Sequence, residues 1–311
     1  MVEAHTEEQH VSKDMYNWVE QSCPICETSS AKFIGRRGGA AHRANLGVEC
    51  EIWRCRRCGL VYPNPMPIPI NGIAQHYSLV PDEYFRNHDT DTRQLNAVNL
   101  LKQAEELTGG KGRLLDIGAG RGEFLVAAVS EGWSAIGIEP SDSFADHAAR
   151  HSGAEIRRVP VEQCGFDAAS FDVVILSAVL EHLYNPDETI KEISRVLRPG
   201  GALFVDVPNE SGLYFKVGNF YQKLRGRKWS VNLAPTFEPF HVFGFNDSSL
   251  RALLRKHGLK VKEWHVYPGR SVLPKQGGVF GALESLMARA VTTASSVGGL
   301  GTYIETWAVK D

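Results

Sequence analysis

The spacing of hydrophobic and polar residues changes repeatedly between residues 113 and 207. Short apolar runs, which predict strands, alternate with longer amphipathic segments, which predict helices. The expected strands are 113–117, 134–139, 155–159, 171–176 and 202–207, and the expected helices are 122–131, 142–151 and 186–196. Because strands that alternate with helices pair in parallel and are covered on both faces, this region predicts an α/β fold with a mostly parallel sheet.

Further elements are expected on either side of this region. A helical pattern runs from Glu83 to Leu107 and is stopped by Gly109 and Gly110, and residues 248–257 form a second one. Apolar runs at 260–267 and 303–309 predict two more strands, which bring the expected sheet to seven strands.

Composition divides the chain into three parts. Residues 1–21 are polar and rich in His and Glu, so we expect a flexible N-terminus there. Residues 22–66 are expected to form a small module, in which 48–54 is a short strand, and residues 67–311 the large α/β domain. Prolines at every second position from 63 to 69 disfavour helix and strand, which predicts a stiff linker at the boundary.

Two segments interrupt the alternation within the large domain. Residues 209–240 are rich in aromatic and basic side chains, and residues 269–301 contain an Ala/Ser/Gly-rich helical pattern. Insertions at strand ends often carry substrate selectivity, so we interpret residues 209–240 as a lid-like insertion. Its aromatic rings could stack on a ring substrate while its cations meet a phosphate or carboxylate, as in a nucleotide-linked sugar. A solvated loop with a small core of its own is the alternative.

Four cysteines form two C-x-x-C pairs in the small module, Cys23 with Cys26 and Cys55 with Cys58. Four thiolates around one cation form a closed tetrahedral site, so this spacing predicts a structural Zn²⁺ rather than a catalytic one. Cys50 and Cys164 lie outside the pairs, and we expect them to be small buried hydrophobic residues.

The charge balance limits the partners. The 34 Lys and Arg residues and 36 Asp and Glu residues leave a formal net charge of −2, so no overall positive field attracts nucleic acid or an anionic membrane. No run approaches the roughly 18 apolar residues that a membrane span needs, and the first residues lack the pattern of a secretory signal. We therefore expect a cytoplasmic protein with a small-molecule partner, and the sequence leaves open whether it is a monomer or a homodimer.

The strongest cofactor motif is a glycine-rich turn after the first strand of the alternating region. Gly118, Gly120 and Gly122 lead into a helix, and such a turn lets the backbone pass close to a ligand. The next strand ends in Glu139, about 20 residues beyond the turn, where a carboxylate can accept both hydroxyls of a ribose. NAD would fit these features as well. Asp116, before the first glycine, can bind a cationic amino group, which S-adenosylmethionine (SAM) has and NAD lacks.

With these residues the chain resembles the class I SAM-dependent methyltransferases over residues 77–311. The further motifs that carry the resemblance are Ser170-Phe171-Asp172-Val173-Val174, Val179-Leu180-Glu181-His182-Leu183, Asn185-Pro186 and Leu197-Arg198-Pro199-Gly200-Gly201-Ala202-Leu203. The resemblance implies a Rossmann-like, seven-stranded, mostly parallel sheet. The cysteine module narrows it to a subgroup with an N-terminal four-cysteine zinc ribbon, which includes enzymes that act on sugars and other small metabolites.

The resemblance also implies roles for individual residues. Asp116 and the turn would hold the methionine part of SAM, Glu139 the ribose, and Val161 with Glu162 the adenine edge. Pro160 departs from the family pattern, because many relatives have Asp there. The full set of implied cofactor residues is Tyr84, Asp116, Gly118, Ala119, Gly120, Gly122, Glu139, Pro140, Val161, Glu162 and Ser177.

Two histidines are candidate catalytic residues. Methyl transfer from a sulfonium needs the acceptor atom aligned behind the methyl group, and a general base helps where the acceptor is a hydroxyl or a carbon acid. His182 follows the fourth strand at the carboxyl edge of the sheet, and His241 ends the aromatic insertion. Glu181 and Tyr184, which flank His182, are weaker candidates. Each histidine can instead be a structural residue that orients a loop.

Three functions stay open at this level. The first is a methyltransferase for a sugar, a nucleotide-sugar or a secondary metabolite. The second is an RNA base methyltransferase whose zinc ribbon binds RNA through its arginines, although the net charge argues against it. The third is a SAM-binding scaffold without catalysis, against which the presence of Asp116, Glu139 and His182 counts.

Overall fold

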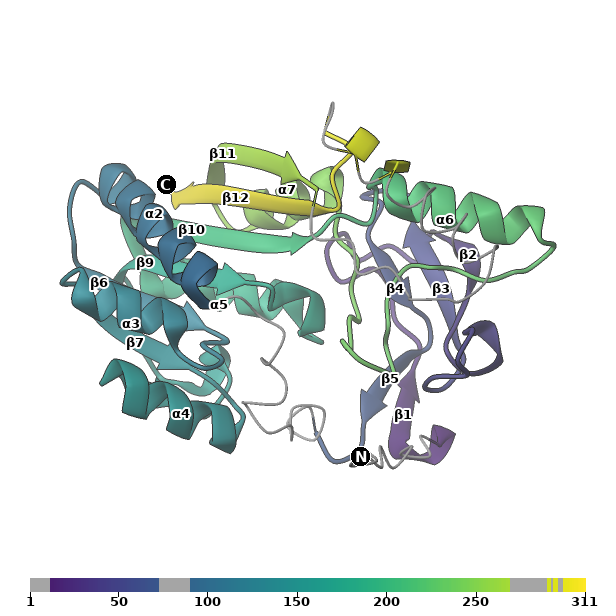
Figure 1. Ribbon diagram of the computed structural model, residues 1–311, viewed down its shortest axis with the longest axis horizontal. Coiled ribbons are helices and arrows are strands. Elements are labelled where there is room, and N and C mark those ends of the chain that lie inside the picture. The colour runs from purple at the N-terminus through teal and green to yellow at the C-terminus, as the bar shows by residue number, and fades with distance from the viewer. Residues whose placement is uncertain (1–11, 73–89, 269–289, 292, 296–298) are drawn as a thin grey trace, which may run out of the picture.

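The computed structural model describes residues 12–72, 90–268, 290–291, 293–295 and 299–311. Two regions lie side by side in Figure 1. An α/β region occupies the left of the view, and a β-rich region that contains the four paired cysteines occupies the right. We call the second region the cysteine module and define it as residues 12–69.

The α/β region is built on a seven-stranded sheet in the order β8-β7-β6-β9-β10-β12-β11. All neighbours pair in parallel except β12, which is antiparallel to both β10 and β11. The Rossmann-like, mostly parallel sheet is thereby confirmed. Its strands are β6 (Arg113–Ile117), β7 (Ser134–Ile138), β8 (Glu155–Arg157), β9 (Phe171–Ser177), β10 (Leu197–Pro208), β11 (Leu259–Tyr267) and β12 (Tyr303–Lys310).

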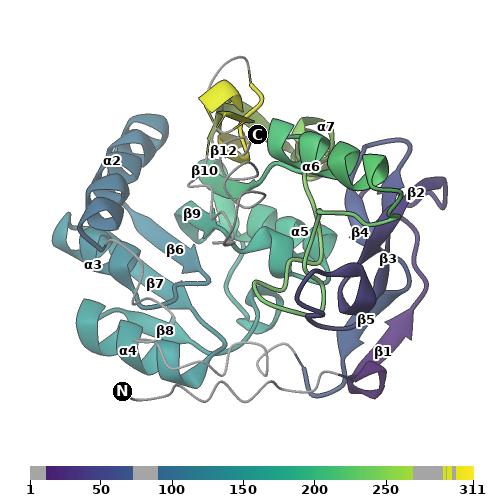
Figure 2. The same ribbon diagram turned by 45° about the vertical axis from the view of Figure 1, so that its right-hand side comes forward.

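Helices cover both faces of this sheet, as Figures 1 and 2 show. One face carries α2 (Thr90–Thr108), α3 (Glu123–Ser130) and α4 (Asp142–Ser152), and the other carries α5 (Pro186–Val196) and α7 (Asp247–Lys256). Successive residues of a strand point to opposite faces. Accordingly Leu114 packs in the core under α2 and α3, whereas Leu115 packs in the core that α5 and α7 share.

The cysteine module contains two small antiparallel sheets. One has the strand order β2-β3-β4, and the other pairs β1 with β5. The bounds are β1 (Tyr16–Val19), β2 (Ala31–Arg37), β3 (Cys50–Cys55), β4 (Val61–Pro63) and β5 (Met66–Pro69). Short 3₁₀ turns are η1 (Lys13–Met15) and η2 (Gly39–Ala41) here, and η4 (Val161–Gln163) and η5 (Leu180–His182) in the α/β region.

Strands β1 and β5 correct two expectations. The N-terminus was expected to be flexible through residue 21, and residues 63–69 were expected to lack regular structure, yet Trp18 pairs with Pro67 and Tyr16 pairs with Pro69. Proline is tolerated in an edge strand, where its missing N–H group needs no partner. The carbonyl group of Pro67 also accepts a hydrogen bond from the Tyr184 hydroxyl at 3.1 Å, which ties β5 to the α/β region.

The first insertion forms a helix and then runs along the cysteine module. Helix α6 (Leu213–Leu224) was not expected from the sequence. After it, Ser230 N donates to Arg36 O at 2.9 Å, and Val48 N donates to Thr236 Oγ1 at 2.9 Å. Residues 228–236 are thus attached to the module, and a lid-like role stays a prediction for α6 alone.

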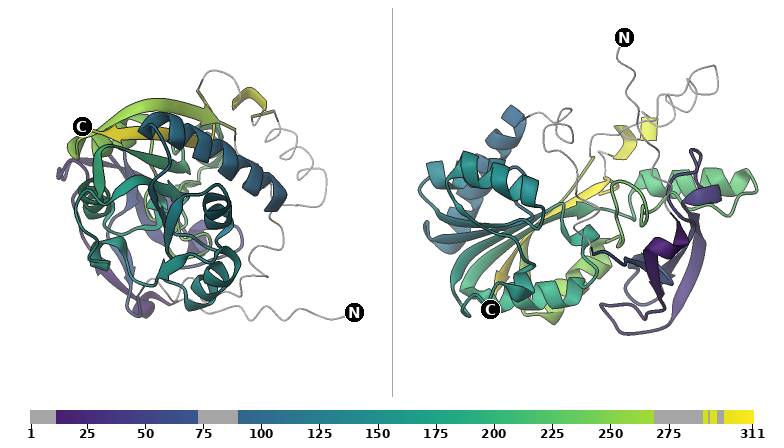
Figure 3. Two further views of the ribbon diagram at one scale, coloured as in Figure 1. Left: turned by 90° about the vertical axis from the view of Figure 1, so that its left-hand side faces the viewer. Right: turned by 90° about the horizontal axis from the view of Figure 1, so that it is seen from below.

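The two regions share one hydrophobic core. Leu60 and Tyr62 of the module belong to the same buried cluster as Phe243, Phe245 and Leu250. Backbone hydrogen bonds between Val61 and Gly244 run in both directions, at 3.0 and 2.8 Å. Figure 3 shows the cysteine module against one end of the sheet. The module therefore packs on the α/β region through a shared core and is not an independent domain on a flexible linker.

The strands and helices expected between residues 113 and 309 match those of the structure to within two residues, with one exception. Strand β10 begins at Leu197 rather than at Ala202, because Leu197 already pairs with Phe171 before a bulge. The start of the helix expected from Glu83, the candidate Tyr84 and most of residues 269–301 lie outside the described residues. No helix in the described ranges is long and apolar enough to cross a membrane.

Candidate functional site

The glycine turn lies at the carboxyl end of β6, where the strand order of the sheet reverses between β6 and β9. Gly118 and Gly122 have φ angles of 73° and 85°, in the left-handed region that disfavours side chains. A Cβ atom on Gly118 would lie 2.4 Å from Val179 Cγ2, and one on Gly122 would lie 2.9 Å from Ala148 Cα. The turn therefore requires glycine for its backbone angles and for its close packing.

Glu139 is bound to this turn through its carboxylate. Its Oε2 atom accepts a hydrogen bond from Gly120 N at 3.0 Å, and its Oε1 atom accepts one from Ser141 N at 2.9 Å. Burial raises the pKa of Glu139, and these two amides oppose the rise. The residue is 8% exposed, so the remaining lone pairs of its carboxylate can accept hydrogen bonds from ribose hydroxyls at the end of β7.

Asp116 lies in β6 just before the turn and is 5% exposed. Burial, with smaller contributions from Glu139 and Glu123, raises the pKa of Asp116 to about 7. A buried carboxylate with acidic neighbours is stabilised by an incoming cation. This environment suits the cationic amino group of SAM.

The other predicted cofactor residues differ in their surroundings. Ala119 and Val161 are buried, whereas Pro140 after β7 and Ser177 at the end of β9 are exposed. The carboxylate of Glu162 accepts a hydrogen bond from the hydroxyl of Thr189 on α5. An adenine contact for Glu162 stays a prediction.

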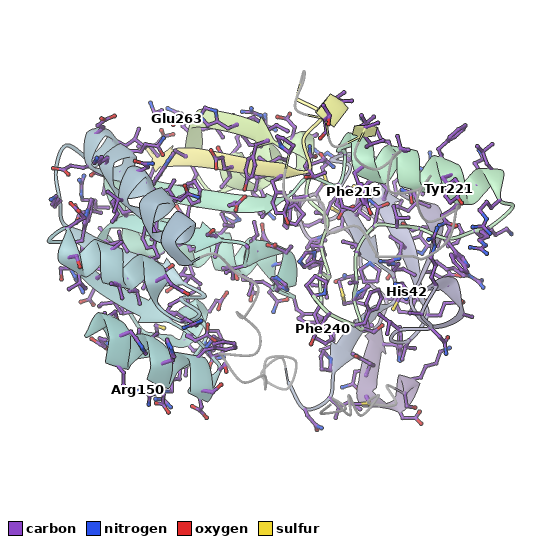
Figure 4. The ribbon with its side chains drawn as sticks, in the orientation of Figure 1. His42, Arg150, Phe215, Tyr221, Phe240 and Glu263 are labelled. Carbon is purple, nitrogen blue, oxygen red and sulfur yellow. The ribbon has the colours of Figure 1, made fainter. Side chains whose placement is uncertain are left out.

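The fold brings the two candidate histidines together from distant positions in the chain. Their ring centroids are 4.7 Å apart, and the rings meet edge to face at 74°. Val242 N and Phe243 N both donate to the carbonyl oxygen of Glu181, at 2.9 and 3.0 Å, which places His241 beside His182. Figure 4 shows Phe240, the residue before His241, between the sheet and the cysteine module.

Glu181 joins this pair and was only a weaker candidate in the sequence. Its Oε1 atom lies 3.9 Å from His182 Nε2 and 3.8 Å from His241 Nε2. Burial raises the pKa of Glu181 to about 8, with a smaller contribution from Asp206, and burial also lowers the pKa of His241 to about 3. The sequence pattern that could have indicated a role for Glu181 is its position next to His182, in the turn after β9. We call Glu181, His182 and His241 the Glu–His cluster.

Tyr184, the other weaker candidate, contacts the cysteine module rather than the Glu–His cluster, because its hydroxyl group donates a hydrogen bond to the carbonyl oxygen of Pro67.

An acid and two tyrosines near the Glu–His cluster were not among the candidates from the sequence. The Tyr267 hydroxyl donates to Asp206 Oδ1 at 3.1 Å, and its ring stacks on Tyr303 with centroids 5.6 Å apart. The position of Asp206 near the carboxyl end of an expected strand could have indicated it.

The four paired cysteines converge in the module. The Sγ atoms of Cys23 and Cys26, of Cys23 and Cys58, and of Cys26 and Cys55 are each 3.6 Å apart. Disulfide sulfurs would be about 2.05 Å apart, whereas four thiolates about 2.3 Å from a central ion would be about 3.8 Å apart. The spacing therefore fits a tetrahedral metal site. Cys50 and Cys164 lie outside this group and are buried, as expected.

A pocket of about 480 Å³ lies beside this cysteine group, between Cys26, Arg57 and the α7 residues Ser248 and Lys256. None of the predicted cofactor or catalytic residues lines it. The functional assignment consequently rests on the carboxyl edge of the sheet and not on this pocket.

Known proteins resemble this chain over the α/β region. Residues 88–263 match the methyltransferase-domain family. This chain belongs to that family and is a SAM-dependent methyltransferase. It is 28% identical over 201 residues to a probable S-adenosylmethionine-dependent methyltransferase of Mycolicibacterium smegmatis, which covers 64% of this chain and 68% of that protein. It is 27% identical over 172 residues to a ubiquinone biosynthesis O-methyltransferase of Coxiella burnetii, which covers 54% of this chain and 71% of that protein.

Solved structures support the fold of the methyltransferase. A SAM-dependent methyltransferase from Archaeoglobus fulgidus superposes with a TM-score of 0.51 at 19% identity, over 74% of this chain and 97% of that one. A putative methyltransferase from Bacillus halodurans superposes with a TM-score of 0.50 at 17% identity, over 68% of this chain and 98% of that one.

Proposed function

We propose that this methyltransferase transfers a methyl group from SAM to a small-molecule acceptor that binds beside the Glu–His cluster. The observation that carries the proposal is the place of the cluster. His182 follows β9, the strand next to β6, so it lies at the sheet edge that also carries the glycine turn.

Three features of the chain would bind the cofactor. Asp116 would pair with its amino group, Glu139 would accept hydrogen bonds from its ribose, and the glycine turn would admit its methionine part close to the backbone. SAM supplies a methyl group on a sulfonium, which an aligned acceptor atom can attack. The chain therefore contributes mainly binding and alignment.

The acceptor would lose its proton at the Glu–His cluster. Burial lowers the pKa of His241 to about 3, so its imidazole is neutral and offers a lone pair that can orient the acceptor hydroxyl by accepting its hydrogen bond. His182 is 16% exposed in its side chain and shares the carboxylate of Glu181 with His241. A hydroxyl acceptor fits this chemistry, and the name of the Coxiella burnetii relative describes it as an O-methyltransferase.

A sugar or nucleotide-sugar is the acceptor class that we favour. Helix α6 carries exposed Lys216, Phe220 and Lys223, and Phe215 and Tyr221 lie on the same helix at the upper right of Figure 4. Aromatic rings bind the apolar faces of ring substrates, and lysines bind phosphate.

The arginines of the cysteine module do not favour RNA as the acceptor. Arg36 is neutralised by ion pairs with Glu49 and Glu51, at 3.3 and 3.2 Å. Arg37 donates through Nε to Leu233 O at 3.0 Å and stacks over the Phe237 ring, so it serves packing within the chain. These contacts remove two members of the arginine cluster that an RNA-binding ribbon would present.

Zn²⁺ is the ion that we propose for the four paired cysteines. The fit rests on the tetrahedral spacing of the Sγ atoms and on the preference of Zn²⁺ for thiolates. In this role Cys23, Cys26, Cys55 and Cys58 would hold the two turns of the module together. The closed set of four ligands makes the site structural.

Calorimetric titration of metal-analysed protein with S-adenosylhomocysteine, and separately with NAD, tests the proposal. We expect micromolar binding of S-adenosylhomocysteine, no binding of NAD and one Zn²⁺ per chain at the cysteines. Titration in the presence of nucleotide-sugars should then change the affinity for S-adenosylhomocysteine. Tight RNA binding with a steep salt dependence and no response to any nucleotide-sugar would contradict a small-molecule acceptor.

A further inference from the structure

We propose that Glu181, His182 and His241 bind a divalent first-row metal ion, at a second metal site distinct from the four cysteines. Two imidazoles and one carboxylate form a donor set that suits Zn²⁺, Fe²⁺ and Mn²⁺. The proposal rests on the proposed function in one respect, which is that the acceptor binds beside this cluster.

The distances within the cluster fit a shared ion better than hydrogen bonds. Both Nε2 atoms lie 3.8 to 3.9 Å from the same oxygen, Glu181 Oε1, beyond the roughly 3.2 Å limit of a hydrogen bond. Two ligands about 2.1 Å from one ion lie roughly 3.0 Å apart at a right angle and at most about 4.2 Å apart on opposite sides. One ligand atom from each of the three residues falls within 4.8 Å of the others, so small side-chain rotations complete the set.

The burial of Glu181 supplies independent support. The residue is 2% exposed, and its Oε2 atom has no hydrogen-bond partner among the described residues. A buried carboxylate without partners is costly unless a cation or a donor compensates it. Asp206 lies near enough for its charge to act on Glu181, which adds negative potential at the same place.

The backbone holds the three donors in place before any ion arrives. Glu181 and His182 share the short turn η5, and the two amide bonds from Val242 and Phe243 to Glu181 O fix the neighbour of His241. The side chains of His182 and His241 keep 16% and 22% of their surface exposed, whereas Glu181 is enclosed. Three protein ligands with an accessible side leave positions for an acceptor oxygen, as in catalytic rather than structural metal sites.

Such an ion would have a different role from the three side chains that bind it. It would hold an oxygen atom of the acceptor and favour its deprotonated form, while the imidazoles act as ligands. The ligands of the cysteine site are softer than those of the Glu–His cluster. Thiolates select Zn²⁺, whereas imidazole and carboxylate also bind Mn²⁺. This difference allows the two sites to be measured separately.

The test is a titration with Mn²⁺ of the full chain loaded with one equivalent of Zn²⁺, which fills the thiolate site and leaves the Glu–His cluster free. The electron paramagnetic resonance signal of free Mn²⁺ follows the binding. We expect one Mn²⁺ per chain in the unaltered protein. His241→Ala and Glu181→Gln should each weaken Mn²⁺ binding at least about tenfold while the Zn²⁺ content stays at one per chain. His265→Ala is the matched control, because His265 is an exposed histidine on β11 beside Glu263 and should bind Mn²⁺ as the unaltered chain does.

Binding of S-adenosylhomocysteine and the thermal midpoint, measured on each variant, show whether it is folded. Folded variants that bind Mn²⁺ as tightly as the unaltered chain would overturn the proposal, and so would an unaltered chain that binds none. If the unaltered chain binds S-adenosylhomocysteine and methylates an acceptor without binding Mn²⁺, the metal site fails while the proposed function stands. If it binds Mn²⁺ at the cluster but not S-adenosylhomocysteine, the proposed function fails while the metal site stands.

Discussion

The predicted cofactor site and the proposed acceptor site of this methyltransferase are built in different ways. Asp116 and the glycine turn lie within one strand-turn-helix unit, and Glu139 ends the next strand along the chain. The Glu–His cluster, in contrast, joins the turn after β9 to the end of an insertion that is itself anchored on the cysteine module. A cofactor site made of local structure tolerates changes elsewhere, whereas a site assembled from distant segments depends on everything that holds them.

Disruption of the cysteine site should have the largest effect. Cys58→Ser is expected to remove the bound metal and to lower the melting temperature of the whole chain by more than about 10 °C, because a structural Zn²⁺ contributes roughly 10 kcal/mol or more to folding. The shared core through Leu60 and Tyr62 predicts one cooperative transition. Scanning calorimetry measures it, with Cys50→Ala as a control that changes a buried cysteine outside the cluster. Two separate transitions, with the upper one unchanged, would show that the module is independent.

His182→Ala should lower the rate of methyl transfer without weakening cofactor binding. Loss of a general base or of a ligand that activates the acceptor is expected to lower kcat by about a hundredfold, while the affinity for S-adenosylhomocysteine changes less than about threefold. Single-turnover kinetics and calorimetry on the same preparation provide the two numbers. An equal loss in both would mean that His182 shapes the cofactor site.

Glu139→Ala should have the converse effect. Removal of a carboxylate that binds the ribose is expected to weaken S-adenosylhomocysteine about 10- to 100-fold, since hydrogen bonds to charged groups contribute about 1.5–3 kcal/mol. Mn²⁺ binding at the Glu–His cluster should remain as in the unaltered chain. Unchanged affinity in calorimetry would refute the ribose assignment.

Cofactor affinity should also depend on pH through Asp116. Its pKa of about 7 means that the carboxyl group is ionised above pH 7 and increasingly protonated below it. A neutral carboxyl group cannot pair with the amino group of the ligand, so affinity should fall as the pH drops from 7.5 to 5.5, by at most about tenfold per pH unit. Calorimetry across this range should give a flatter profile for Asp116→Asn. Equal slopes in the two proteins would assign the pH dependence to another group.

The smallest expected effect is the difference in stability between Gly122→Ala and Gly132→Ala, which separates the cost of the backbone angle from the cost of close packing. Gly122 and Gly132 have φ angles of 85° and 84°, but a Cβ atom on Gly122 would lie 2.9 Å from Ala148 Cα whereas one on Gly132 would meet nothing within 4 Å. Both changes to alanine carry the same strain of about 1 kcal/mol, and Gly122→Ala should lose about 1–3 kcal/mol more. Chemical denaturation measures the difference, and equal losses would mean that the helix moves to accommodate the methyl group.

Sequence reasoning succeeded where structure is local. The strands that flank Asp116 and Glu139, the helix 186–196 and the pairing of the four cysteines follow from periodicity, glycine chemistry and C-x-x-C spacing within short windows. It failed for β1, which polar composition assigns to a flexible terminus, and for β5, whose prolines disfavour a strand, because the two strands pair across about fifty residues of sequence. Helix α6 was missed although Leu213, Val217, Phe220 and Leu224 recur at helical spacing, because the aromatic and basic composition of residues 209–240 led to its interpretation as an insertion.

The sequence alone predicted a nucleotide-like cofactor at the glycine turn, since strand, turn and acid are encoded within about thirty residues. Only the tertiary structure decided that His182, His241 and Glu181 share one place, because two backbone hydrogen bonds join segments that no local pattern relates. The same holds for the cysteine module. Its four paired cysteines are readable from spacing, but its union with the methyltransferase core depends on buried contacts between Leu60, Tyr62 and Phe243 that form only when the whole chain folds.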